Sequence, residues 1–141
     1  MTGAGRGHRV LPHTADIRIR AWAPTREECI AEAVTGLVRS FVEPAGDRPA
    51  WAVDAELVAE SDQDALVAAL DEVIYVLDTQ GGVPVEASVD RPADGRWRLR
   101  LLVAAVDDMP RVGAVPKAIT WHGLRFGCTD GAWSCEVLVD V

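Results

Sequence analysis

The stretch TREECIAEAVTGLVRSF (25–41) decides the fold class, because it defines both the start and the inner face of a helix. Thr25 and Glu28 have the spacing of a capping box, in which a hydroxyl and a carboxylate satisfy the free amides of the first turn. The apolar residues that follow recur at intervals of three and four and therefore share one stripe facing a core: Ile30, Val34, Leu37, Val38 and Phe41.

A second amphipathic helix is predicted after Ser61-Asp62-Gln63-Asp64. The serine hydroxyl can cap the first turn, and the acidic side chains meet the positive end of the helix dipole. The pair Gly81-Gly82 favours an end to this helix. Its apolar stripe is formed by Leu66, Leu70, Val73, Ile74 and Leu77.

The rest of the chain alternates polar and apolar residues, which is typical of half-buried strands. We expect a β-α-β-α-β-β-β-β order within one domain spanning residues 1–141. The economical architecture is an α+β two-layer sandwich, with a mixed or antiparallel β-sheet and both helices packed on one face. Residues 1–9 are Gly-rich and basic and are expected to be a flexible leader. The predicted strands cover 16–22, 50–58, 84–90, 96–105, 115–126 and 133–141.

Composition limits the possible classes of function. Apolar residues make up 49% of the 141 residues, which predicts one soluble domain. No apolar run approaches the roughly 20 residues that a membrane span needs. The net charge of −8 repels a phosphate backbone unless one face segregates its positive charge, so strong direct nucleic-acid binding is not expected. Phosphate-binding loops of the GxGxxG or GxxxxGK type and a GxSxG elbow are absent.

The cysteines Cys29, Cys128 and Cys135 lack the paired spacing of a zinc site, and no signal peptide precedes them. This usage favours a reducing cytoplasm. A pairing of Cys128 with Cys135 across a hairpin stays open beside the favoured interpretation of plain thiols.

Two sets of candidate site residues stand at strand ends. His13 and Asp16 lie before the first clear strand, where they could form a metal or proton-transfer site or simply a turn. Asp140 and the α-carboxylate of Val141 place two anions together, which suits calcium or magnesium but also describes a solvated chain end.

Two further candidates carry weaker signals. Lys117 begins a mostly apolar strand, either for a functional reason or as a lysine whose stem follows the strand edge into solvent. Asp78 lies near the C-terminus of the second helix, where a carboxylate is mildly unfavourable, so it is a helix-to-loop residue or an additional site.

Four motifs taken together, HTAD (13–16), LDTQG (77–81), KAITWHGL (117–124) and VLVDV (137–141), resemble the archease family in order and spacing. The resemblance implies a non-catalytic protein cofactor of an RtcB-type RNA ligase in tRNA splicing and RNA repair, which promotes guanylylation and multiple turnover of the ligase. It also implies that Asp16 and Asp140, with Val141, hold calcium or magnesium, and that Lys117 and His13 take part in activating the partner.

The chain departs from the family pattern after the first helix, where residues 39–44 (RSFVEP) replace an acidic turn. A possible metal ligand is therefore missing. Two other functions stay open: a chaperone-like binding module for an RNA-modifying enzyme, and a small metal-dependent phosphoesterase.

Overall fold

The computed structural model describes residues 5–12, 16–44, 49–107 and 109–141. The elements follow one another as β1 (Gly7–Pro12), β2 (Asp16–Ala23), α1 (Arg26–Arg39), β3 (Ala50–Leu57), α2 (Asp62–Gln80), β4 (Gly82–Asp90), β5 (Trp97–Ala105), β6 (Ala118–Thr129) and β7 (Ala132–Asp140).

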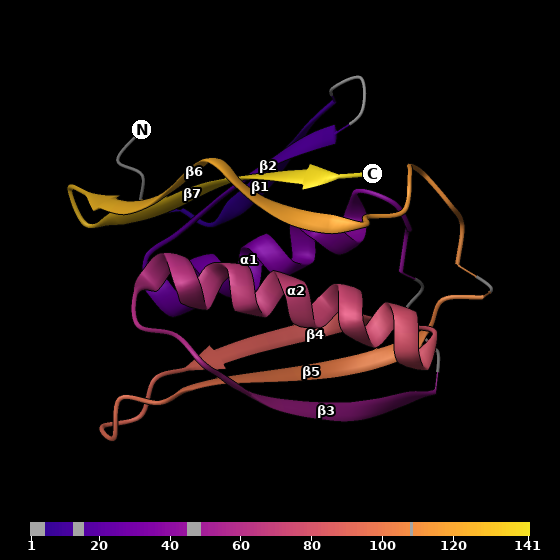
Figure 1. Cartoon of the computed structure of the whole chain (residues 1–141), viewed down its shortest axis with the longest axis horizontal. Coiled ribbons are helices and arrows are strands. Elements are labelled where there is room, and N and C mark those ends of the chain that lie inside the picture. Colours follow the sequence, from indigo (N-terminus) through magenta and orange to yellow (C-terminus); the bar gives the residue numbers. More distant parts are fainter. Residues whose placement is uncertain (1–4, 13–15, 45–48, 108) are drawn as a thin grey trace.

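The strands form two antiparallel sheets with the helices between them (Figure 1). One sheet has the order β1-β2-β7-β6, and the other has the order β3-β5-β4. Helix α1 contacts β2 of the first sheet and β4 of the second, and α2 likewise contacts both sheets. The predicted α+β class and the antiparallel pairing are confirmed, but the strands are divided between two sheets instead of forming a single one.

The division into two sheets follows from how completely α1 is buried. Residues 29–34 of α1 are buried without interruption, so the helix has no exposed face over this stretch. A helix that is apolar on most of its circumference needs cover on more than one side. Here that cover comes from β2, β4 and α2, and Ile30, Val34 and Ala33 are fully buried among them.

Both predicted helix caps are present. The Thr25 hydroxyl accepts from the Glu28 amide at 3.1 Å, as an N-cap does, and it donates to the Glu28 carboxylate at 3.0 Å. The Ser61 hydroxyl accepts from the Asp64 amide at 3.1 Å. Helix α2 ends at Gly81, whose φ of 67° lies in the left-handed region that glycine adopts without strain.

The prediction of a flexible leader over residues 1–9 is wrong for residues 7–9, and residues 1–4 lie outside the described residues. Gly7, His8 and Arg9 belong to β1, which pairs with β2. His8 Nδ1 lies 2.6 Å from the Glu32 carboxylate of α1, and Arg6 also pairs with Glu32. Burial opposes ionisation of Glu32, but the hydrogen bonds with His8 and Arg6 outweigh it and lower the pKa of this carboxyl. Side-chain contacts to α1 therefore fix the start of β1.

The cysteines are free thiols. Cys128 is opposite Trp133 and Cys135 is opposite Phe126, so the two cysteines are not cross-strand neighbours. Cys135 is buried, whereas Cys128 is exposed. Neither helix combines the length and the apolar character needed to cross a membrane, within the residues that the structure describes.

Candidate functional site

The register of the four-stranded sheet brings Asp16 and Asp140 together. Asp16, the first residue of β2, is directly opposite Asp140, the last residue of β7, and Asp140 is opposite Ala118 at the start of β6. Residues of β2 and β7 that point inward, such as Ile19 and Val139, are fully buried, so the alternation places both aspartates on the outer face. The first-strand and last-strand candidates of the sequence thus share one cross-strand row.

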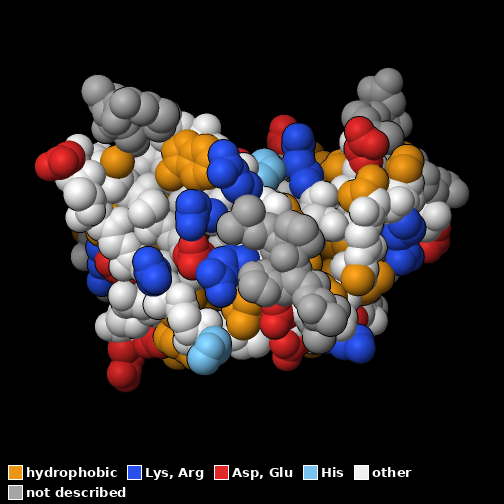
Figure 2. Space-filling model, turned by 90° about the horizontal axis from the view of Figure 1, so that it is seen from above, with side chains coloured by type: hydrophobic (Ala, Val, Ile, Leu, Met, Phe, Trp, Pro, Cys, Tyr) orange, Lys and Arg blue, Asp and Glu red, His pale blue; other side chains and the backbone are white. Residues whose placement is uncertain are grey.

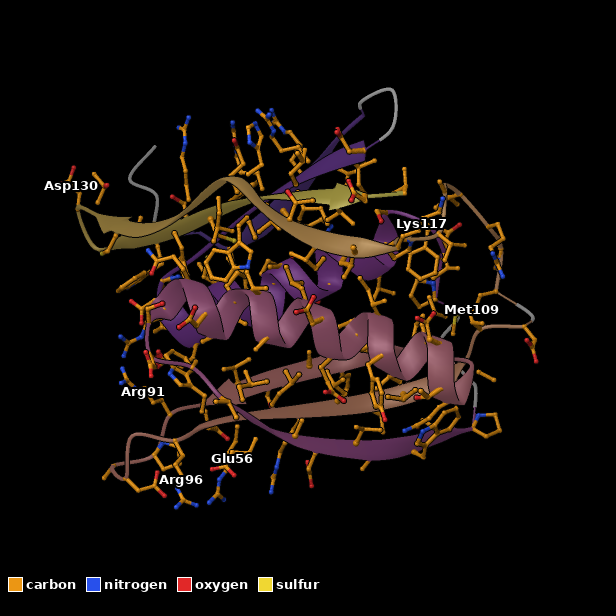
Figure 3. All side chains as sticks on the ribbon, in the orientation of Figure 1. Glu56, Arg91, Arg96, Met109, Lys117 and Asp130 are labelled. Carbon is orange, nitrogen blue, oxygen red and sulfur yellow. The ribbon has the colours of Figure 1, made fainter. Side chains whose placement is uncertain are left out.

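Lys117 adjoins this row through the backbone. Its amide donates to the carbonyl of Asp140 at 2.7 Å, which holds it one residue before β6. Its side chain is exposed and forms no ion pair with any residue that the structure describes, and Figure 3 shows Lys117 where β6 begins, at the end of the molecule where β7 stops. Lys117 is also the only lysine in the sequence, and the other 13 of the 14 Lys and Arg residues are arginines.

The segment that leads to Lys117 is fastened to the end of α1. The Glu43 amide donates to the Pro110 carbonyl at 3.0 Å, and the Val112 amide donates to the Phe41 carbonyl at 2.9 Å. Gly113 approaches the helix end so closely that a Cβ there would lie 2.2 Å from the Ser40 carbonyl oxygen. In the sequence, only the glycine itself pointed to this contact.

The remaining candidates lie elsewhere or cannot be placed. His13 falls outside the described residues. Asp78 is exposed on α2, three residues before the cap Gly81, and within the described part of the chain no contact joins it to Asp16, Asp140 or Lys117. Val141 follows Asp140 and is half-buried. The candidate set that the fold brings together is therefore Asp16, Asp140 and Lys117.

Arginines surround a glutamate four residues away from this row along β7, and sequence reasoning did not single them out. Arg20 donates through Nε and Nη2 to Glu136 Oε1 at 3.1 and 2.8 Å, and Arg18 Nη1 lies 3.5 Å from Oε2. The hydrogen bonds from Arg20 are the main reason why the pKa of Glu136 is lowered. The alternation Asp16-x-Arg18-x-Arg20 was the available signal, because it places charges at three successive outward positions of β2.

The row offers two carboxylates, the type of ligand that calcium and magnesium prefer. Among the described residues no group of three or more His, Cys, Asp and Glu side chains is placed to hold a metal ion. A broad cleft of about 580 Å³ lies over the other sheet, lined by residues such as Ala52, Glu86 and Arg100, and is not part of the aspartate row. The chemistry of interest is therefore at an open surface and not in a cavity.

Comparison with known proteins gives a consistent result. The Archease protein family (MTH1598/TM1083) matches residues 8–141. A probable protein archease of Mycobacterium tuberculosis is 44% identical over 139 residues, covering 99% of this chain and 77% of that protein. A protein archease of Methanosarcina barkeri is 25% identical over 146 residues, covering all of both chains.

Solved structures agree with the fold. The solution structure of Methanobacterium thermoautotrophicum protein 1598 has a TM-score of 0.69 at 20% identity and covers both chains completely. The crystal structure of a Thermotoga maritima archease, described as a possible chaperone, has a TM-score of 0.66 at 21% identity and covers 94% of this chain and 96% of that one. The family match extends over both β2 and β7, which carry the two aspartates, and over Lys117 between them. The chain belongs to the archease family.

Proposed function

We propose that this protein is an accessory factor that activates an RtcB-type RNA-splicing ligase, by promoting guanylylation of the ligase and its repeated turnover. Family membership supports an accessory role, because a relative of the same fold is described as a possible chaperone, a protein that acts on other proteins. The observation that carries the proposal is the meeting of Asp16, Asp140 and Lys117 at one edge of the four-stranded sheet.

Exposed apolar side chains on both sides of Lys117 support a protein partner. Val112, Val115 and Trp121 are 57%, 38% and 54% exposed, all within ten residues of chain. Scattered apolar residues are ordinary on a surface, but a group beside charged residues is typical of a protein interface. A partner seated there would bury the apolar groups and receive the amine of Lys117.

The two aspartates are the part of the site that a divalent cation would use. Asp16 and Asp140 supply oxygen ligands suited to calcium or magnesium, and water or the partner would complete the coordination shell. When bound, such an ion supplies positive charge beside the nucleotide chemistry of the ligase. The chain's own contribution is to hold both carboxylates on neighbouring strands, and to hold Lys117 next to them through the Asp140 carbonyl.

The test is to incubate the purified protein with its cognate ligase and GTP, and to measure guanylylated ligase over time. Substoichiometric protein is expected to raise the rate, and Lys117→Ala is expected to abolish most of the increase. Lys117→Arg keeps the charge and separates a need for charge from a need for the primary amine. Arg98→Ala is the matched control, because it removes an exposed cation from the opposite sheet.

An unchanged rate with the wild-type protein would remove the proposal. The chaperone alternative predicts a different result in the same experiment, namely more folded, soluble ligase without a higher rate per folded ligase. A phosphoesterase would release phosphate or cleave an RNA end without any ligase present.

A further inference from the structure

One cross-strand row of the four-stranded sheet gathers arginines on its outer face. Arg9 of β1 is opposite Arg20 of β2, Arg20 is opposite Glu136 of β7, and Glu136 is opposite Arg125 of β6. Arg18 lies one outward position further along β2. Figure 2, which views the molecule from the side of this sheet, shows Lys and Arg side chains gathered near the middle of the face. We call these residues, Arg9, Arg18, Arg20 and Arg125, the arginine face.

The arginine face stands out because the chain as a whole has a net charge of −8. Three of these four guanidinium groups act on one carboxylate, Glu136, which forms ion pairs with Arg18 and Arg20 and also feels the charge of Arg125. Arg9 and Arg125 are exposed and form no ion pair with any described residue, so their charge is available to a ligand. The outer face of the other sheet differs, because Arg100 there pairs with Asp54 and the exposed side chains of Glu56, Glu86 and Asp90 accompany it.

Beside the arginine row lies an aromatic ring. The next row contains Gly7 of β1 opposite Trp22 of β2. A Cβ on Gly7 would lie 2.5 Å from Cζ2 of the Trp22 ring, so the indole rests directly on the backbone of β1 at a position that only glycine permits. Trp22 is half-buried, with part of its ring open to solvent.

Apolar residues that a folded partner protein would need are lacking on most of this face. Among the described large hydrophobic residues that are exposed, only Trp121 of β6 belongs to this sheet, and none belongs to β1, β2 or β7. Protein interfaces are depleted of charge at their centre, whereas single-stranded nucleic acid is bound by cationic surfaces together with aromatic rings on which bases stack. The combination of free arginines and an indole matches the second pattern.

We propose that the arginine face binds single-stranded RNA, with phosphates on the arginines and a base against Trp22. The four strands span about 14 Å at about 4.8 Å per strand, which accommodates two or three successive phosphates. The aspartate row lies four residues further along β2 and β7, about 13 Å away, so a bound strand would lead toward the proposed activation site. The choice of RNA over DNA rests on the proposed function, whereas the binding of a phosphate backbone does not.

The binding is expected to be weak and dependent on salt. Nonspecific contacts of this kind give dissociation constants of about 1–100 μM at physiological salt. With three phosphates neutralised, the slope of log K against log salt concentration is expected to be about −2 for a single strand. This is consistent with an acidic protein that is not a strong stand-alone RNA binder.

The test measures fluorescence anisotropy of a labelled 12-nucleotide RNA with the protein alone, without ligase or GTP. The double variant Arg9→Gln/Arg125→Gln is expected to weaken binding about tenfold at low salt and to flatten the slope by about 1.4, the share of two phosphates. The double variant Arg98→Gln/Arg100→Gln makes the same charge change on the other sheet and is expected to bind like the wild type.

A gain of affinity provides a second measurement. Glu136→Gln removes the only carboxylate in the arginine row and releases Arg18 and Arg20, so it is expected to bind RNA more tightly than the wild type. Trp22→Leu is expected to weaken the binding of the single strand and to leave the salt slope unchanged, because stacking involves no counterion.

Several results would overturn the inference. The first is that binding of the RNA does not depend on salt, and the second is that both double variants lose the same amount of affinity for RNA. The third is that a polyglutamate peptide displaces the labelled RNA as efficiently as unlabelled RNA does. The last result would assign the face to an acidic protein segment. The RNA-binding experiment contains no ligase, so a negative result there does not change the outcome of the guanylylation test. A negative guanylylation test likewise does not change the measured affinity for RNA.

Discussion

Replacing Gly113 by alanine tests whether the segment before Lys117 is positioned by its contact with the end of α1. The new Cβ would lie 2.2 Å from the Ser40 carbonyl oxygen, a backbone atom that cannot turn aside. Carbon and carbonyl oxygen approach each other to about 3.3 Å, so the segment must move by about 1 Å. That displacement breaks or weakens the hydrogen bonds from Val112 to Phe41 and from Glu43 to Pro110.

The expected cost follows from those two bonds. Each contributes a net of about 0.5–1.5 kcal/mol, so the free energy of unfolding should fall by about 1–3 kcal/mol. At about 4 °C per kcal/mol for a chain of this size, the melting temperature should fall by about 4–12 °C. Thermal unfolding followed by far-UV circular dichroism measures this shift. Activation of the ligase should fall more than the folded fraction does, because Lys117 lies only four residues beyond the change.

Gly127→Ala is the matched control for Gly113→Ala. A Cβ at Gly127 meets nothing within 4 Å, and its φ lies outside the left-handed region, so this variant should melt like the wild type. If Gly113→Ala also melts within 2 °C of the wild type and activates normally, the segment is not positioned by the helix end and the reasoning is wrong.

Three further predictions concern the charged residues. Calcium at about 100 times its Kd should stabilise the folded state by about 2.7 kcal/mol, which corresponds to a rise of about 10 °C in the melting temperature. Asp16→Asn and Asp140→Asn should each remove that rise in a thermal melt. Lys117→Ala should change the free energy of unfolding by less than about 0.5 kcal/mol in urea titration, because the side chain is exposed; a larger loss would make Lys117 structural. Arg20 is the main reason why the pKa of Glu136 is lowered in the folded state. The ionised carboxylate therefore stabilises the fold above the unfolded pKa near 4.5, and this stability is lost as pH falls through the lower folded pKa. In the variant Glu136→Gln, the free energy of unfolding should accordingly fall less steeply below pH 4.5 than in the wild type.

Local signals in the sequence predicted the helices well. The caps at Thr25 and Ser61 and the glycine at 81 depend only on neighbouring residues, and each is found where it was expected. Strand positions from β3 onward were also close, because alternation is local. The start of β6 differs, since residues 115–117 precede the strand, and Pro116 there has no amide to donate to a sheet.

The partition into two sheets could not be read from local patterns. Whether Ala31 or Ala33 is covered depends on which strands approach, and alanine suits both a surface and a core. The pairing of Arg9 with Arg20 was likewise hidden, because a Gly-rich, basic segment carries little strand propensity and is ordered by Glu32 of α1. Tertiary contacts decided both cases.

The candidate site residues were chosen through the family resemblance more than through physics. Each of Asp16, Asp140 and Lys117 had an ordinary structural explanation when taken singly. Their adjacency depends on the register of strands from opposite ends of the chain, which alternation does not specify. The irregular pairing of β6 between Thr120 and Arg125 was also missed, although Gly123, with φ of 69°, was its sequence signal.

The two sheets also differ in when they can form during synthesis. The three-stranded sheet is built from residues 50–105, one continuous stretch, and can assemble as soon as that stretch has left the ribosome. The four-stranded sheet needs β7, which is made after the six other described strands, to pair with β2, which is made second. Such non-local pairing is slow, and until it occurs β2 presents an open edge to other nascent chains. Emergence of β7 therefore closes that edge and sets Asp140 opposite Asp16 in the same step, so no shorter nascent chain can display the paired aspartates.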